Sequence, residues 1–457
     1  MKRIQSINPF TEKLNAEFDY FSKSKALERI KKSRSAFSDW EELSPSSRGS
    51  FFRKLSDVLG KKKRNIAEKI TQEMGKPISQ ALTEIERCMN ICTYFADHAE
   101  ELMKNEIVST NLKKSYVAFQ PLGIILGIMP WNYPIIQTFR FAIPTLLAGN
   151  VVVLKPASNV PLCGLAIEES FREAGFPEGV FQTLLIDAST ATDLIREDIV
   201  NGVSLTGSFE AGSQVASAAG SRIKKVVLEL GGSDPFIVLE DANVETVAKI
   251  AAQTRFVNCG QSCVAAKRFL VMDSIAEKFS EAFIQEMNQY RIGDPMDENT
   301  GMGPLYSRKG IEELRQQVED ARAKGAEIIE GPPIPERGAF FRPVVIRYAN
   351  RDMRVAREET FGPIAPIFRI SNEKELLELA NDTEFGLGAT VWTGDVERGE
   401  RLARRIRAGF VGVNQIVRSD PRLPFGGTKM SGIGRELSYF GVREFTNIKT
   451  VVLENQK

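Results

Sequence analysis

Apolar and polar positions alternate in two different ways along the chain. Up to about residue 100, apolar residues recur at helical spacing, which predicts amphipathic helices. From about Gly123 onward, short runs of Val, Ile and Leu alternate with helical stretches. Such strands indicate a parallel sheet that helices cover on both faces, so we expect an α/β protein. The apolar positions of one expected helix, over 47–70, include Phe51, Phe52, Leu55, Val58 and Leu59.

The apolar runs fall into two successive units, in each of which strand-like and helical segments alternate. The change from one unit to the other lies near Gly232. Most are bounded by Gly, Pro or polar residues, as strands of a buried sheet are. In the first unit we expect strands at 123–129, 151–156, 180–186, 202–207 and 225–232. In the second unit we expect them at 236–239, 267–272, 341–346, 388–393 and 409–414.

Two further strand candidates, 112–120 and 447–454, have no obvious partner nearby in the sequence. An unpaired strand exposes backbone groups that other chains can pair with, so proteins usually cover such edges. The two segments therefore predict a small oligomerisation module, and we expect a homodimer or a homotetramer.

Composition excludes several classes of partner. The 457 residues contain 60 Lys and Arg against 59 Asp and Glu, so no large net charge draws the protein to nucleic acid or to a membrane. No charge occurs between Lys114 and Arg140, but prolines and glycines interrupt this stretch, which indicates a buried strand, a loop and a helix start. The N-terminus lacks a signal-like apolar segment and five cysteines make no disulfide framework, so we expect a cytoplasmic protein.

The sharpest local signal is the segment Asn258 to Cys263, which contains Cys259 and Cys263 in a short polar loop after a helix. A cysteine in such a loop can be reactive, although two buried thiols that pack as small apolar groups are the simpler interpretation. The only histidine is His98, on an expected exposed helix face. If Cys263 is catalytic, its base is therefore a carboxylate or a lysine.

A zinc site is a second use for cysteines with three residues between them, as in Cys88/Cys92 and Cys259/Cys263. In a helix the same offset simply places two thiols on one face, and Cys88 and Cys92 lie in a helical pattern. We expect no metal.

Three other segments could support the chemistry. Glu229 ends an apolar strand, where burial would raise its pKa toward that of a general base, unless it turns to solvent. Asn132, between aromatic residues and prolines, could donate to an oxyanion or simply start a helix. Gly207 and Ser208 lie between a strand and a helix, where a phosphate could approach the helix N-terminus, but they do not form a GxGxxG motif.

Together these segments resemble the aldehyde dehydrogenase superfamily over nearly the whole chain. The resemblance implies a Rossmann-type cofactor domain at 1–111 and 124–229, and a catalytic domain at 230–414. It also implies an oligomerisation hairpin at 112–123 that is completed by 415–457. The motifs occur in the family's order: PWNYP, LLAGNVVVLKPAS, GFPEGVFQ, TGS, ELGGSDP, NCGQSC, REETFGP and PFGGTKMSGIGRE.

The resemblance also implies a role for each matching residue. Cys263 is the nucleophile, Glu229 is the base that activates water for hydrolysis of the thioester, and Asn132 completes the oxyanion hole with the Cys263 N–H. The residues implied to bind the cofactor are Trp131, Lys155, Ser158, Gly207, Ser208, Leu230, Glu359 and Phe361.

Ser158 and Arg140 refine the expected cofactor and substrate. Many family members that use NAD carry Glu where this chain has Ser158, and its loss beside Lys155 removes the repulsion of a 2′-phosphate. We therefore expect NADP, with NAD also possible. Arg140 and Ser419 resemble residues that hold the distal carboxylate in succinate-semialdehyde dehydrogenases. An internal salt bridge is the alternative for Arg140, and Val257 replaces another arginine of some of those enzymes.

The expected activity is thus NAD(P)-dependent oxidation of succinate semialdehyde to succinate. Three alternatives stay open: another small aldehyde such as glutarate semialdehyde, lactaldehyde or an aliphatic aldehyde; a family member that binds cofactor without turnover; and, for Cys259, a regulatory disulfide with Cys263 in place of an inert thiol.

Overall fold

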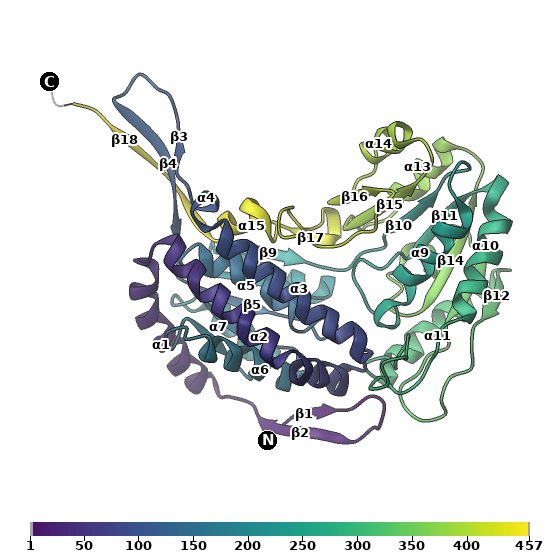
Figure 1. Ribbon diagram of the computed structural model, residues 1–457, viewed down its shortest axis with the longest axis horizontal. Helices are drawn as coiled ribbons and strands as arrows, with labels where there is room; N and C mark the ends of the chain where they lie inside the picture. Colours follow the sequence, from purple (N-terminus) through teal and green to yellow (C-terminus); the bar gives the residue numbers. More distant parts are fainter. Residues whose placement is uncertain (1–2, 456–457) are drawn as a thin grey trace.

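The computed structural model describes residues 3–455 and consists of two α/β lobes with a β-arm that projects from one of them (Figure 1). Each lobe is built on its own, largely parallel sheet, and helices pack around it. The expected α/β fold class is therefore confirmed.

The sheet of the first lobe has the strand order β17-β9-β8-β5-β6-β7. The chain builds β5, β6 and β7 outward in one direction, then returns to add β8 and β9 on the other side of β5. In such a sheet the crevice for a ligand opens at the carboxyl ends of the strands, where the order reverses. The strands are β5 (Ile124–Ile128), β6 (Val151–Lys155), β7 (Phe181–Thr183), β8 (Gly202–Thr206), β9 (Lys225–Glu229) and β17 (Gly432–Ile433).

Eight helices from the N-terminal half of the described chain belong to this lobe, and their apolar faces fill a core that is continuous with the sheet. The helices are α1 (Lys23–Glu41), α2 (Pro45–Met74), α3 (Ile78–Asp97), α4 (Ala99–Leu102), α5 (Ile136–Leu147), α6 (Pro161–Glu173), α7 (Ala188–Arg196) and α8 (Phe209–Gly220).

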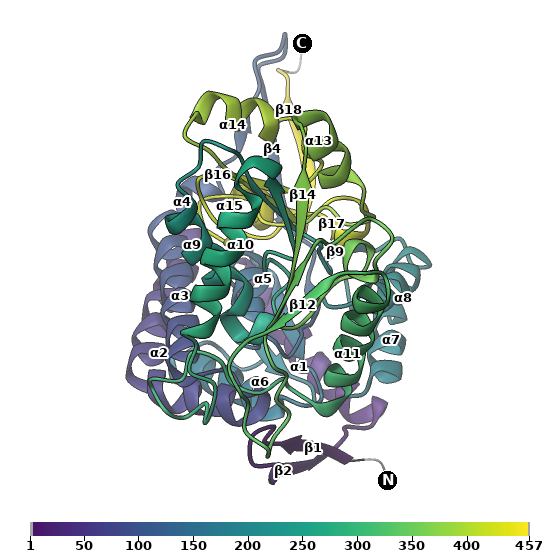
Figure 2. The ribbon, with the colours of Figure 1, turned by 90° about the vertical axis from the view of Figure 1, so that its right-hand side faces the viewer.

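The sheet of the second lobe has the order β12-β13-β14-β11-β10-β15-β16 and is parallel except for the edge strand β12. Figure 2 shows this lobe from its own side, with α10 to the left of the strands β12 and β14 and α11 to their right. The strands are β10 (Pro235–Val238), β11 (Arg268–Met272), β12 (Glu327–Glu330), β13 (Val344–Arg347), β14 (Ile364–Ile370), β15 (Gly388–Trp392) and β16 (Phe410–Val413). The helices are α9 (Val244–Phe256), α10 (Asp273–Asn288), α11 (Arg308–Ala323), α12 (Arg354–Arg357), α13 (Glu373–Asn381) and α14 (Val396–Ala403).

The β-arm joins the two strand candidates for which the sequence shows no local partner. Strand β4 (Lys114–Pro121) pairs along its whole length with β18 (Thr446–Leu453) in an antiparallel register, and the short β3 (Glu106–Ile107) pairs with the other edge of β4. The arm therefore unites segments that lie more than three hundred residues apart in the sequence.

Two features differ from the sequence expectation. Residues 3–19 are not helical: β1 (Arg3–Ile7) and β2 (Leu14–Asp19) form an antiparallel hairpin. Its turn is stabilised by Asn8 Oδ1, which accepts hydrogen bonds from the N–H groups of Phe10 and Thr11. The spacing of apolar residues does not reveal such a local turn.

The second difference concerns the C-terminal region, because residues 415–445 do not lie in the arm. Within residues 415–445, β17 pairs antiparallel with β9 of the first sheet, and α15 (Ser438–Glu444) packs against α5. A two-residue strand has no periodicity to detect, which explains why the sequence pattern does not show it. The boundaries of the domains stay a prediction.

No helix within residues 3–455 is both long enough and apolar enough to span a lipid bilayer.

Candidate active site

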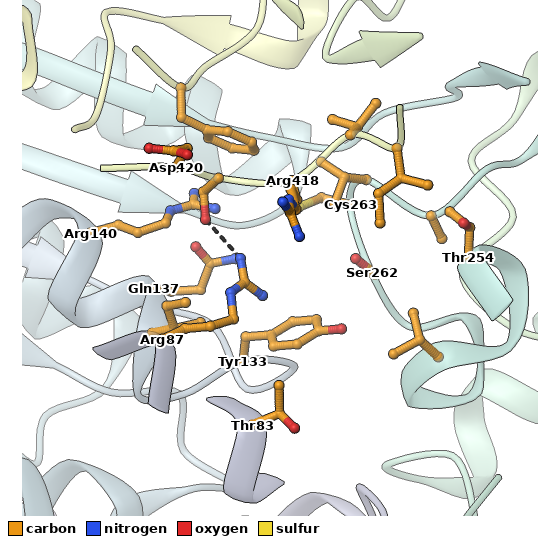
Figure 3. Close-up of a pocket in the computed structure, with 18 of the residues that line it drawn as sticks. Thr83, Arg87, Tyr133, Gln137, Arg140, Thr254, Ser262, Cys263, Arg418 and Asp420 are labelled. Carbon is orange, nitrogen blue, oxygen red and sulfur yellow. Dashed lines mark hydrogen bonds between the residues drawn. The ribbon is translucent and has the colours of Figure 1, made fainter. Parts of the chain in front are cut away.

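A pocket of about 570 Å³ lies where the two lobes meet. Helices α3 and α5 of the first lobe line one side, α9 and the loop 262–265 line another, and the segment 416–425 closes it (Figure 3). Cys263 and Arg140, both expected site residues, are among the residues that line the pocket. His98 does not line it; its ring stacks on Tyr94 elsewhere on the first lobe.

The loop before Cys263 has an unusual backbone. Asn258, with φ of 51°, and Cys259, with φ of 55°, are in the left-handed region, and Gly260 follows with φ of 73°. A non-glycine residue in this region typically costs about 1–3 kcal/mol, so the surrounding structure has to stabilise this turn. Gly260 could not be replaced freely, because a Cβ there would collide with the Gly362 carbonyl.

Two buried cations provide that stabilisation. The Arg255 guanidinium donates to the carbonyls of Ala266, at 2.8 Å, and Thr360, at 3.1 Å, and also to Gly362. The Lys267 ammonium donates to the carbonyls of Ser262, at 2.9 Å, and Cys263, at 2.6 Å. Both cations therefore bind backbone oxygens, which fixes the loop that carries Cys263, the expected nucleophile.

Hydrogen bonds from amide side chains also hold the loop in place. Asn258 Nδ2 donates to the carbonyls of Asn132 and Gln261, and Gln261 Nε2 donates back to the Asn258 carbonyl. Gln261 Oε1 accepts the N–H of Tyr306. The loop of the second lobe is thereby tied to the segment after β5 in the first.

Cys263 is 8% exposed and faces the pocket. Burial raises the pKa of its thiol well above the usual value and the charge of Glu229 raises it further, whereas the charges of Arg140 and Lys267 favour the thiolate. Cys259 points elsewhere, into the core of the second lobe, and is 1% exposed. Both thiols are free.

Glu229 ends strand β9 and is 1% exposed, so the alternative of a solvent-facing carboxyl is wrong. Burial raises the pKa of its carboxyl to about 7, although the nearby Arg140 charge acts in the opposite direction. Neither carboxyl oxygen has a hydrogen-bond partner within residues 3–455. A buried acid with a pKa near neutrality and unused acceptors can take a proton from a water molecule beside it.

Arg140 is buried on α5 between two carboxylates. Its Nη2 lies 2.7 Å from Glu436 Oε2 and 3.4 Å from Glu229 Oε2, and its Nε donates to Glu436 at 2.7 Å. Its guanidinium also lies over the ring of Phe425, 4.2 Å from the centroid. The internal salt bridge that the sequence left open is therefore present, and a direct role of Arg140 toward the substrate stays a prediction.

Asn132 follows β5 and is 5% exposed. Its Nδ2 donates one hydrogen bond, of 3.1 Å, to the Gln261 carbonyl, and its Oδ1 accepts the N–H of Tyr133. The amide carries a second N–H, so it retains a donor for an oxygen atom beside Cys263.

The residues expected to bind a cofactor lie at the carboxyl ends of the parallel strands in the first lobe. Lys155 ends β6, Gly207 and Ser208 connect β8 to α8, and Leu230 follows β9. Ser208 is exposed and caps α8, because its Oγ accepts the N–H of Ala211. The hydroxyl of Thr206, which ends β8, is buried and has no partner within the described chain.

This arrangement fits a dinucleotide. A twelve-residue helix presents its N-terminus at the crevice, and free N–H groups there suit a phosphate. Burial lowers the pKa of the Lys155 ammonium, and it has no ion-pair partner within residues 3–455. Ser158, three residues later, is exposed.

The expected nicotinamide-binding residues lie between this crevice and the nucleophile loop. Glu359 accepts the N–H of Gly232, at 3.1 Å, and pairs with Lys267, at 3.2 Å. Trp131 stacks on Tyr306, with ring centroids 3.7 Å apart, and meets the edge of Phe361. Lys267 thus contacts both Glu359 and the Cys263 carbonyl, which links the expected cofactor site to the nucleophile.

The structure adds three charged residues that the sequence did not single out: Glu436, Arg87 and Arg418. Glu436 pairs with Arg140 across 296 residues, and no local pattern reveals such a partner. Arg87 lies on α3, and its Nη2 donates to Ser419 Oγ at 2.8 Å. Arg418 directly precedes Ser419, the one signal that could have drawn attention to it.

Comparison with known proteins agrees with the fold and the site geometry described above. The model of the "Aldehyde dehydrogenase family" matches residues 1–451. A "Probable succinate-semialdehyde dehydrogenase [NADP(+)]" from Synechocystis is 44% identical over 98% of this chain and 99% of its own length. A "Succinate semialdehyde dehydrogenase [NAD(P)+]" from Escherichia coli is 40% identical over 98% of this chain and 97% of its own.

The comparison extends to solved structures. The succinic semialdehyde dehydrogenase of Streptococcus pyogenes, in complex with NADP+, superposes with a TM-score of 0.96 at 33% identity, covering 99% of this chain and 100% of that one.

The left-handed turn generates a stability prediction. We expect Gly260→Ala to lower the free energy of unfolding by more than about 1 kcal/mol. The new Cβ would collide with the Gly362 backbone, and alanine rarely adopts the positive φ of this position. Differential scanning calorimetry would show a lower melting temperature. Gly220→Ala is the matched control, since a Cβ at Gly220 meets nothing within 4 Å, and an equal loss in both variants would contradict the prediction.

Proposed function

The chain belongs to the aldehyde dehydrogenase family, and we propose that it oxidises succinate semialdehyde to succinate with NADP as its preferred cofactor and NAD as an alternative. The observation that carries this proposal is the convergence of Cys263, Glu229 and Asn132 beside an arginine-lined pocket.

We assign Cys263 as the nucleophile. As a thiolate it attacks the aldehyde carbon, and the oxygen of the resulting adduct receives hydrogen bonds from Asn132 Nδ2 and the Cys263 N–H. Removing one such donor typically costs about 3 kcal/mol of transition-state stabilisation. The bound nicotinamide supplies the acceptor for the hydride that leaves the substrate carbon, and the product on Cys263 is a thioester.

We assign Glu229 as the base for the second half of the reaction. Its carboxylate takes a proton from water, and the water oxygen attacks the thioester carbon, which releases the acid and restores the Cys263 thiolate. The proton on Glu229 then passes to solvent. The Arg140 guanidinium opposes the effect of burial on the Glu229 pKa, and this balance keeps the pKa near neutrality. Glu436 in turn keeps Arg140 in place.

The cofactor preference rests on Lys155 and Ser158. A carboxylate at position 158 would pair with the ribose hydroxyls of NAD and repel a 2′-phosphate, whereas Ser158 leaves the positive charge of Lys155 unopposed. The NADP specificity in the name of the Synechocystis relative, and the NADP+ bound in the Streptococcus structure, support this preference.

We further propose that the protein works in the cytoplasm as a homodimer or a homotetramer. Apolar side chains on the β-arm and beside it support the assembly, because Ile107, Ile448, Val452 and Tyr439 are each more than 40% exposed in the single chain. Sedimentation equilibrium distinguishes the two assemblies, and a monomer at micromolar concentration would exclude both.

An aldehyde panel tests the activity. We expect reduction of NADP with succinate semialdehyde at a higher kcat/KM than with glutarate semialdehyde, lactaldehyde or butanal, measured by cofactor absorbance. Cys263→Ala should show no turnover with any of them. Turnover by that variant would contradict the assignment of the nucleophile, and a higher kcat/KM for another aldehyde would change the proposed substrate.

The Glu229 pKa predicts a pH dependence. A base works only when it is deprotonated, so the rate of thioester hydrolysis should fall as the pH drops through about 7. Glu229→Gln should lose this dependence, slow steady-state turnover by about 10²-fold or more, and still release one equivalent of reduced cofactor in a rapid burst. Stopped-flow absorbance measures both phases, and a variant without a burst would place Glu229 in the first step instead.

The Ser158 assignment predicts a change in cofactor preference. Ser158→Glu should lower kcat/KM for NADP by about tenfold or more, because the new carboxylate would repel the 2′-phosphate, and a tenfold loss corresponds to about 1.4 kcal/mol. Ser158→Gln, similar in size but uncharged, should retain NADP. A wild-type enzyme with a strong preference for NAD would contradict the assignment.

A further inference from the structure

The helices that follow the strands of the first sheet differ in how their N-termini are capped. Helices α7 and α8 are capped by Asp187 and Ser208, which directly precede them. Helices α5 and α6 have no such cap, because the residues at their N-cap positions, Ile135 and Val160, are apolar. The free N–H groups at a buried helix start need acceptors, so these must come from elsewhere in the fold.

Glu73, the penultimate residue of α2, supplies the acceptors for α6. Its Oε1 accepts the N–H of Leu162 and its Oε2 accepts that of Cys163, both at 2.9 Å. Pro161, the first residue of α6, has no N–H to donate, so one carboxylate binds the free donors of this turn. Because Glu73 is fully buried, the contact fixes the point at which α6 begins.

Glu84, on α3, does the same for α5. Its Oε1 accepts the N–H groups of Ile135, at 3.0 Å, and Ile136, at 3.1 Å. Its Oε2 pairs with the Lys76 ammonium, and neither side chain is exposed to solvent. The Lys76 ammonium in turn lies 3.6 Å from the centroid of the Tyr133 ring, so the segment before α5 is held as well.

These two helices begin directly after the segments that carry expected site residues. Asn132 lies in the segment 129–135, between β5 and α5, and Ser158 lies in the segment 156–160, between β6 and α6. Because each segment is short, its path is set by the strand before it and the helix after it. The start of α5 therefore determines where the Asn132 amide lies, and the start of α6 determines where Ser158 lies.

The two carboxylates lie where α2 ends and α3 begins, at residues 73–84, hereafter the α2–α3 corner. Helix α2 packs against α6, and α3 packs against α5 (Figure 1). The second lobe holds the corner in place, because the Ile78 N–H donates to the Pro295 carbonyl at 2.8 Å and Gln80 Nε2 donates to the Gly301 carbonyl at 2.9 Å. The carboxylates are thus anchored independently of the two loops.

We propose that Glu73 and Glu84 are positioning residues for two different parts of the reaction: Glu73 for the loop that binds the cofactor, and Glu84 for the loop that carries the Asn132 amide. The inference rests on the proposed function, which assigns these roles to the two loops. Neither carboxylate touches the reacting atoms, because each acts through the backbone of the helix that it caps. Glu73 should therefore control cofactor affinity, and Glu84 the rate of the chemical step.

Glu73→Leu tests the first role, because it removes both acceptors and leaves no buried cation without a partner. We expect the Kd for NADP, measured by isothermal titration calorimetry without aldehyde, to rise about tenfold, with no change in the rate of the first cofactor reduction at saturating NADP. Glu73→Gln, which retains one acceptor, should recover part of the affinity. Glu86→Gln is the matched control, since Glu86 is exposed on α3 and pairs with Lys63, and it should change neither value.

The second role needs a double variant, because a change of Glu84 alone would leave the Lys76 ammonium buried without its partner. In Lys76→Met/Glu84→Leu we expect the rate of the first cofactor reduction, measured by stopped-flow absorbance with succinate semialdehyde, to fall about tenfold or more. A displaced Asn132 amide would stabilise the oxyanion less. The Kd for NADP should stay the same, and Lys76→Met/Glu84→Gln, which retains an acceptor for α5, should recover most of the rate.

The outcomes are distinct. If the Leu variants change the Kd and the rate together, or lower only the melting temperature, the α2–α3 corner has a purely structural role and the inference is wrong. An unchanged Kd in Glu73→Leu would exclude the role of Glu73 in the same way. If the wild-type protein binds NADP but oxidises no aldehyde, the proposed function fails, whereas the Kd of Glu73→Leu still decides whether Glu73 positions the cofactor loop.

Discussion

The rest of the site depends on two buried cations that bind backbone carbonyls. Arg255 and Lys267 are both fully buried, and their donors go to the oxygens around the loop 258–263. A left-handed turn of three residues would be unstable by itself, and here charge-assisted hydrogen bonds offset its strain. The position of the Cys263 sulfur follows from this backbone, so the proposed nucleophile is oriented before any substrate arrives.

A second constraint is the alternation of charges from Glu229 through Arg140 to Glu436. Burying a single carboxylate is costly, and a lone arginine beside it would over-stabilise its ionised form. With a second carboxylate on the other side of Arg140, the guanidinium is shared, and the pKa of Glu229 settles near neutrality. The pairing of β17 with β9 supplies the second carboxylate, since it holds the segment that contains Glu436 against the base.

Much of the fold and of the candidate site could be predicted from the sequence, and the signal differs between the fold class and the individual residues. The α/β class follows from apolar runs that alternate with helical stretches, and Cys263 and Glu229 lie in segments that are locally distinctive. The N-terminal hairpin was missed, because an Asn8 turn overrides helical periodicity. The partner of Arg140 was missed as well, since Glu436 is near only in space. Arg87 was missed for a related reason: on α3 it resembles any polar position, and only the fold shows that it lines the pocket and donates to Ser419.

The contact between Glu436 and Arg140 has a consequence for how the protein is made. Translation proceeds from the N-terminus, and the nucleophile, the base and the amide donor all emerge from the ribosome well before residue 436. Until the final segment is added, Arg140 lacks its main counter-charge and Glu229 lacks its strand neighbour. Glu229 therefore reaches its final electrostatic environment only after residues 432–436 have been synthesised and have docked on the first lobe.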